Sequence, residues 1–194
     1  MRLKFLAVLA GALLMTVPAF AGTADFCLGQ TANADTGTAS LSAGGITATG
    51  FASNGVMEDL YCKAEGANET GLGLANTADH EIGVNNFIQL DMGNFTSTVL
   101  TIESVQSTEG FSIIGTNSAG TLAGGSTLAG ETDGGTDTVT VNFAGFQFVD
   151  ITATAGNVLL GSVSTPEPST YLLMGTGLLM LGMLVRRKFA SASC

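Results

Sequence analysis

The C-terminal segment of the chain most strongly limits what the chain can fold into. From Ser169 to Val185 there are 17 consecutive residues without a charge, most of them apolar. A helix of that length covers roughly 25 Å, close to the minimum for crossing a bilayer. We therefore expect a transmembrane helix over about residues 169–185, with the rest of the chain folded outside the membrane.

The two flanks of this apolar run predict its orientation. The residues before it, Pro166, Glu167 and Pro168, form an extended and accessible segment, because proline cannot sit inside a helix. Basic residues tend to stay on the cytoplasmic side of a membrane. We therefore predict a cytoplasmic stop immediately after the run, formed by Arg186, Arg187 and Lys188.

This order of parts, from about Thr165 to Lys188, closely resembles the PEP-CTERM sorting signal of Gram-negative bacteria. The resemblance implies that residues 164–194 are a sorting signal recognised in the membrane by an exosortase, a cysteine transpeptidase-like enzyme that removes the tail. It also implies that the recognised residues are Pro166, Glu167 and Pro168. The protein would be anchored transiently in the inner membrane and then reach the cell surface or extracellular matrix. An ordinary single-pass anchor is the alternative.

Residues 1–21 have the pattern of a Sec signal peptide. A basic start precedes an apolar stretch from Phe5 to Val17, and the segment ends Ala19-Phe20-Ala21. Small residues three and one before the cut are typical of signal-peptidase sites, so Ala19 and Ala21 predict cleavage after Ala21. A signal anchor is the alternative, and the helix-interrupting Pro18 argues against it. The Sec machinery and signal peptidase are therefore expected partners.

The remaining residues, 22–163, are enough for one domain with a core. Five of the six Lys and Arg residues of the chain lie in the two terminal signals, which leaves Lys63 as the only base among 15 acidic residues. The net charge of this part is therefore near −14. Nucleic acid is excluded as a partner, because binding phosphates requires clustered cations.

The cysteines predict one disulfide. Cys27 and Cys62 lie in the exported part, where an oxidising compartment would let them pair, whereas Cys194 belongs to the cytoplasmic tail. In the chain-entropy model, closing a loop of that length stabilises the fold by about 4 kcal/mol.

Short apolar stretches separated by turn-forming residues predict an all-β domain, a two-sheet antiparallel sandwich flanked by the N-terminal signal helix and the C-terminal transmembrane helix. Alternation is clearest where Leu100 and Ile102 are interleaved with polar residues. The nine candidate strands are 45–51, 60–64, 71–74, 87–91, 98–105, 111–115, 138–143, 146–152 and 158–163.

Two connections are also predicted. Ala144–Gly145 is a tight turn into the next strand, and we expect the densest core around Phe143, Phe146, Phe148 and Ile151. Residues 117–135 form a long loop or irregular hairpin with a weak edge strand. The domain also resembles a group of exported PEP-CTERM proteins of unknown function with a jelly-roll-like sandwich, through Gly71–Leu74, Asp79–Ile82, Phe87–Asp91, Phe148–Ala153 and Asn157–Ser162.

We do not expect an enzyme. His80 is the only histidine, no Gly-x-Ser-x-Gly elbow is present, and the cysteines are expected to be paired. The sharpest polar cluster is Asp79-His80-Glu81. Its carboxylates together with Asp91 are candidate Ca²⁺ ligands, since Ca²⁺ prefers oxygen ligands, and no other cofactor is expected. The alternative is a solvated loop of an acidic protein.

Two functions remain open. The first is an exported, exosortase-sorted, non-catalytic protein of the cell surface or extracellular matrix, associated with exopolysaccharide or adhesion, as the sorting resemblance implies. The second is a calcium- or glycan-binding β-sandwich module that is only transiently anchored in the membrane.

Overall fold

The computed structural model describes residues 20–66, 68–77, 79–131, 135–166, 175–176 and 179. The chain divides into two compact units, one of Gly22–Thr165 and one of the terminal segments Met1–Ala21 and Pro166–Cys194. The first unit is all-β, as predicted. The expected signal helix over 1–21 and membrane helix over 169–185 lie almost entirely outside the described residues. Within those residues, no helix is long and apolar enough to cross a membrane.

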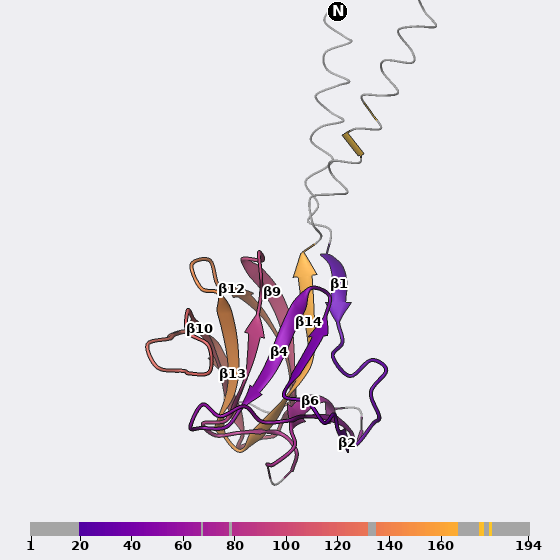
Figure 1. Cartoon of the computed structure of the whole chain (residues 1–194), viewed down its shortest axis with the longest axis vertical. Coiled ribbons are helices and arrows are strands. Elements are labelled where there is room, and N and C mark those ends of the chain that lie inside the picture. The colour runs from indigo at the N-terminus through magenta and orange to yellow at the C-terminus, as the bar shows by residue number, and fades with distance from the viewer. Residues whose placement is uncertain are drawn as a thin grey trace, which may run out of the picture. The chain divides into compact units, whose positions relative to one another are not determined.

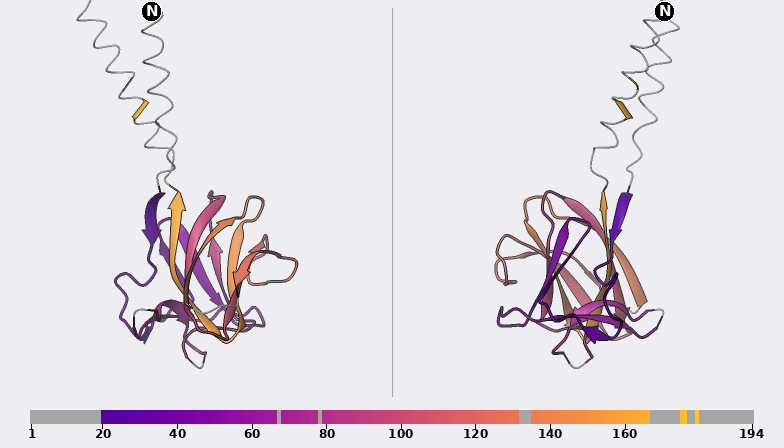
Figure 2. Two further views of the ribbon diagram at one scale, coloured as in Figure 1. Left: turned by 180° about the vertical axis from the view of Figure 1, so that it is seen from behind. Right: turned by 45° about the vertical axis from the view of Figure 1, so that its right-hand side comes forward.

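The strands form two antiparallel sheets, which confirms the predicted two-sheet sandwich (Figures 1 and 2). Sheet A has the order β12 (Gly135–Asn142), β9 (Ser97–Val105), β14 (Asn157–Pro166), β6 (Thr70–Leu74), β5 (Leu60–Ala64) and β2 (Ala34–Asp35), and β1 (Phe20–Ala24) and β7 (Ile82–Gly83) also pair with β14. Sheet B has the order β11 (Ser126–Glu131), β10 (Gly110–Thr116), β13 (Phe148–Ala155), β8 (Phe87–Asp91), β4 (Ile46–Phe51) and β3 (Ser40–Ala43). The jelly-roll-like connectivity stays a prediction.

All nine candidate strands are present, with ends that differ from the prediction by at most a few residues. Five further strands are short or built from small residues, namely β1, β2, β3, β7 and β11. The expected weak edge strand within residues 117–135 is β11, which forms one edge of sheet B. Strands of two residues carry too little alternation for a pattern to reveal them.

The core lies between the inner faces of the two sheets. On sheet B the register places Ala48 opposite Leu90 and Leu90 opposite Val149, so three neighbouring strands present apolar side chains to the same face. On sheet A, Leu72 lies opposite Leu160. These side chains are fully or almost fully buried. The alternation seen in the sequence therefore marks the core correctly for most strands.

The connection at Ala144–Gly145 differs in one respect from the expectation. The turn is present, because Phe146 N donates to Phe143 O at 2.9 Å and Gly145 has a φ of +99°. However, it carries the chain from β12 in sheet A to β13 in sheet B. Phe143 and Ile151 are buried in the core, and Phe146 packs partly against it.

The predicted core position of Phe148 is wrong. It pairs with Asp91 on the outer face of sheet B, where it is half-buried, because Phe148 and Ile151 are three residues apart in one strand. Side chains an odd number apart point to opposite faces, so only one of the two can enter the core.

The predicted disulfide is confirmed. Cys27 and Cys62 are bonded with a Cα–Cα distance of 5.6 Å and a sequence separation of 35. The bond ties the segment after β1 to β5 and thereby to sheet A. In the chain-entropy model the crosslink stabilises the fold by restricting the unfolded chain. This stabilisation supplements that of a core built mostly from short strands.

The glycines of β6 allow a loop to lie directly on the outer face of sheet A. Leu72 and Leu74 point into the core, so Gly71 and Gly73 face outward. A Cβ atom at Gly73 would overlap the carbonyl oxygen of His80. The loop between β6 and β7 can approach the strand only because position 73 lacks a side chain.

We expect Gly73→Ala to destabilise the domain by about 1–3 kcal/mol, because the methyl group must displace the backbone at His80. Gly83→Ala is the matched control, since its Cβ would meet its nearest atom, Asn157 Oδ1, at an ordinary 3.4 Å. Urea unfolding of the exported protein measures both. Equal midpoints for the two variants would contradict this account of β6.

Candidate functional sites

The strand β14 leads directly into the segment predicted to be the sorting signal. Val163 pairs with Leu100 and Ser164 with Val99 of β9, and Thr98 Oγ1 donates to Ser164 O at 2.8 Å. In Figure 1 the arrow of β14, in orange, lies beside that of β1, in indigo, with which it pairs. The β unit is therefore hydrogen-bonded up to the second residue before Pro166.

Most residues of the two processing signals fall outside the described part of the chain. Pro166 is the last residue of β14, and Ala21 lies within β1. The other predicted residues, Ala19, Glu167, Pro168, Arg186, Arg187 and Lys188, are not described. The predicted cleavage after Ala21 would leave Gly22–Ala24 of β1 on the mature chain.

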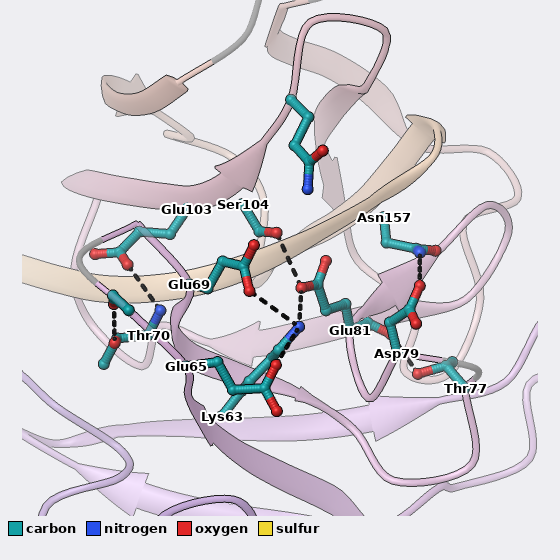
Figure 3. A network of polar contacts seen from close by, with 12 residues as sticks. Lys63, Glu65, Glu69, Thr70, Thr77, Asp79, Glu81, Glu103, Ser104 and Asn157 are labelled. Carbon is teal, nitrogen blue, oxygen red and sulfur yellow. Dashed lines mark hydrogen bonds and ion pairs between the residues drawn. The ribbon is translucent and has the colours of Figure 1, made fainter.

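The only base of the exported domain is the centre of a buried ionic network (Figure 3). Lys63, on β5, donates from Nζ to Glu81 Oε1 at 2.6 Å, and both side chains are almost fully buried. Ser104 Oγ, from β9, donates to the same oxygen at 2.9 Å. Glu65 and Glu69 lie farther from Nζ, at 3.5 and 3.6 Å, and are more exposed.

The network keeps Lys63 charged. Burial by itself lowers the pKa of Lys63, but the hydrogen bond and charge of Glu81, with the charges of Glu69 and Glu65, outweigh it and raise the pKa above its ordinary value. A buried carboxylate would be costly alone, and the ammonium together with the Ser104 hydroxyl offsets that cost. The network therefore joins β5, β9 and the loop before β7.

The loop before β7 has a fixed conformation. His80 adopts a φ of +58°, and its Nδ1 lies 2.9 Å from Ala75 O. The imidazole ring stacks on Tyr61 with centroids 4.1 Å apart. Thr77 Oγ1 donates to Glu81 O at 2.6 Å. The Asp79-His80-Glu81 cluster is thus built into the fold, and the interpretation as a solvated loop is wrong for Glu81.

The structure does not bring the candidate Ca²⁺ ligands together. Asp79 Oδ2 accepts from Asn157 Nδ2 at 3.0 Å, whereas Glu81 turns inward to Lys63. Asp91 lies at the end of β8 in sheet B and accepts from Gly93 N. Among the described residues, no group of three or more His, Cys, Asp or Glu side chains is placed to hold a metal ion. The grouping predicted from the sequence is therefore corrected.

A second buried carboxylate lies on the outer face of sheet B. Asp150, on β13, is fully buried and accepts from Gln89 Nε2 and from Thr116 Oγ1, each at 2.7 Å. The loop after β10 covers the part of this face around Gln89, since Gln89 Nε2 also lies 3.3 Å from Ser118 O and Gly120 N donates to Gln89 Oε1 at 3.1 Å. Sequence patterning missed this network.

Burial raises the pKa of Asp150 to about 6, while the hydrogen bonds from Thr116 and Gln89 hold it lower than burial alone would. The folded state therefore binds a proton that the unfolded state releases between about pH 4 and pH 6. Stability is higher at the acidic end of this window and falls as pH rises through it. Asp91, on the neighbouring strand, is the other carboxylate of this outer face, and it is partly exposed.

Comparison with known proteins identifies the C-terminal segment. Residues 164–188 match the model of the PEP-CTERM protein-sorting motif. No curated protein and no solved structure that was compared matches the chain. The chain thus carries a PEP-CTERM sorting motif, which marks an exported protein targeted to an exosortase.

We expect Lys63→Met to cost about 3–5 kcal/mol at pH 7, because it leaves Glu81 charged, buried and without its cation. Glu65→Gln, which breaks only the more exposed pair, should cost less than about 1 kcal/mol. Urea titrations at pH 7 measure both losses of stability, and similar losses for the two variants would refute a central role for Lys63–Glu81.

The raised pKa of Asp150 predicts that its replacement changes the pH dependence of unfolding. Asp150→Asn keeps an acceptor and a donor for Gln89 and Thr116 but cannot titrate. It should remove up to about 3 kcal/mol of the stability difference between pH 4 and pH 7. Asp35→Asn, at an exposed carboxylate that accepts from Gly37 N, makes the same charge change as a control. A slope that Asp150→Asn leaves unchanged would rule the account out.

Proposed function

We propose that the chain is a non-catalytic protein of the cell surface or extracellular matrix, delivered there by exosortase and associated with exopolysaccharide or with adhesion. The observation that carries this proposal is the PEP-CTERM motif over residues 164–188. The signal peptide, the membrane helix and transient inner-membrane anchoring are parts of the same proposal.

The position of the motif at the end of the β unit supports removal of the tail from a folded domain. Ser164 is both the first residue of the matched segment and the last residue of β14 that pairs with β9. Removal of the tail beyond Pro-Glu-Pro would therefore leave sheet A complete. The mature protein would be a β-sandwich held by one disulfide, without the basic stop and without Cys194.

The environment of His80 supports a non-catalytic role. The ring that any histidine-dependent nucleophile would need is stacked on Tyr61, and its Nδ1 lies against a main-chain carbonyl. A general base must be within hydrogen-bond reach of the group it deprotonates. Among the described residues no serine or threonine side chain is hydrogen-bonded to this ring.

The alternative is a calcium- or glycan-binding module that uses the tail only as a temporary anchor. A calcium-binding role loses support because Asp79, Glu81 and Asp91 form hydrogen bonds to three different partners. A glycan-binding role is compatible with delivery to the cell surface. Cell fractionation separates a protein whose location depends on sorting from a binding module whose location does not.

We expect the triple variant Pro166→Ala, Glu167→Ala, Pro168→Ala to stay in the inner-membrane fraction of an exosortase-positive host. The unaltered chain should move to the surface or exopolysaccharide fraction, and should be retained in the membrane when exosortase is deleted. The variant Ser191→Ala, Ser193→Ala changes residues beyond the matched segment and should behave like the unaltered chain. Normal delivery of the triple variant to the surface would contradict the sorting proposal.

A further inference from the structure

Two adjoining depressions lie at one end of the sandwich, on either side of the loop that follows β4. One has a volume of about 380 Å³ and is lined by Val56, Met57 and Asn76 among others. The other has a volume of about 420 Å³ and is lined by Asn85 and by residues 120–123 of the loop after β10. Asn54 borders both, so the two depressions form one continuous surface, which we call the asparagine surface.

The loop that separates the depressions is held in shape by its own hydrogen bonds. Gly55 N donates to Ala52 O, and Ala52 N donates to Val56 O, each at 2.9 Å. Asn54 Oδ1 accepts from Val56 N at 3.0 Å, and Asn86 Oδ1 accepts from Ser53 N at 3.0 Å. The oxygens of these two amides are thus used to build the loop.

The amide nitrogens on this surface are unused. Within the described residues, the side-chain nitrogens of the four asparagines donate no hydrogen bond, namely Asn54, Asn76, Asn85 and Asn86. Each amide nitrogen offers two donors. The surface therefore presents a group of free donors on a backbone that is already fixed, which lowers the entropic cost of binding a partner.

The surface is also nearly free of charge. Among the described residues, its one carboxylate is that of Glu58, which is 8% exposed and accepts from Asn76 N at 3.0 Å. The rest of the domain carries 14 further acidic residues. Apolar side chains lie beside the amides, and Val56 and Met57 are 59% and 65% exposed.

Free amide donors, exposed aliphatic groups and a lining with a single, almost buried carboxylate match the chemistry of a neutral polysaccharide. Sugar hydroxyl and ring oxygens can accept from the asparagines, and the C–H faces of the sugar can pack on Val56 and Met57. An anionic polymer would be repelled by the net charge of the domain near −14. We propose that the asparagine surface is a binding site for an uncharged polysaccharide chain, an inference that rests on the proposed association with exopolysaccharide and names its site.

The described residues of the site include no exposed aromatic side chain on which a sugar ring could stack, so a single contact is weak. Phe87 borders one depression but is only 2% exposed. A polymer offers many copies of the same sugar unit, so each protein molecule can rebind repeatedly while it migrates through a gel that contains the polymer. Retardation in a gel that contains the polymer is therefore a suitable measurement.

The test uses the exported, processed protein in native gels that contain dextran, mannan or β-1,3-glucan as neutral probes and alginate as the anionic probe. Asn54→Asp keeps the oxygen that accepts from Val56 N, but it replaces the donors with a charge. Asn142→Asp is the matched control, because Asn142 Oδ1 accepts from Ala144 N in the same kind of turn on another loop. Asn76→Asp is a second variant whose side chain makes no bond among the described residues.

We expect retardation by at least one neutral probe, weakened about 10-fold in Asn54→Asp and Asn76→Asp and unchanged in Asn142→Asp. No retardation by any neutral probe, retardation by alginate alone, or equal retardation of all variants would overturn the proposal. Fractionation of Asn54→Asp cells keeps this result separate from the proposed function. Normal exosortase-dependent delivery of a variant that no longer binds shows that sorting and binding are independent.

Discussion

The hydrogen bonding of β14 between β9 and β6 is the constraint on which the rest of the structure depends. This last strand contacts β9 along one edge, β6 and β7 along the other, and it also pairs with β1. Without it, sheet A would be divided into two parts with unpaired edges in the middle of the domain. The sandwich is therefore complete only when the chain has reached Ser164, where the sorting motif begins.

Part of the outer face of each sheet is covered by a loop of the same domain, and each covered part includes a buried polar network. On sheet A, the loop before β7 brings Glu81 to Lys63. On sheet B, the loop after β10 covers Gln89 and Asp150. Buried polar groups of this kind are costly unless they are satisfied, so both loops are held in one arrangement. This leaves the loops at the end of the sandwich, around Asn54, to present free polar groups.

The sequence predicted the parts of the fold that depend on local alternation. Leu100 and Ile102 face the core as expected, and Cys27 and Cys62 are bonded. Prediction from the sequence failed where contacts between distant segments determine which side chains are buried. Asp150 is placed by alternation on the solvent side of β13, and only the loop around Gly120 makes that face buried. Glu81 is likewise buried in contact with Lys63, which lies 18 residues earlier in the sequence. The sequence did contain one indication of the Lys63 network, because a single base among 15 acidic residues is expected to form an ion pair.

The proposed processing would trim the protein at both ends, and the position of β14 would leave the disulfide-bonded sandwich intact. The most direct test is the intact mass of the exported protein, measured before and after reduction. We expect a chain that begins at Gly22, ends after the Pro166–Pro168 segment without Arg186–Cys194, and gains two hydrogen atoms on reduction. An exported chain that retains Cys194, or whose mass does not change on reduction, would contradict this expectation.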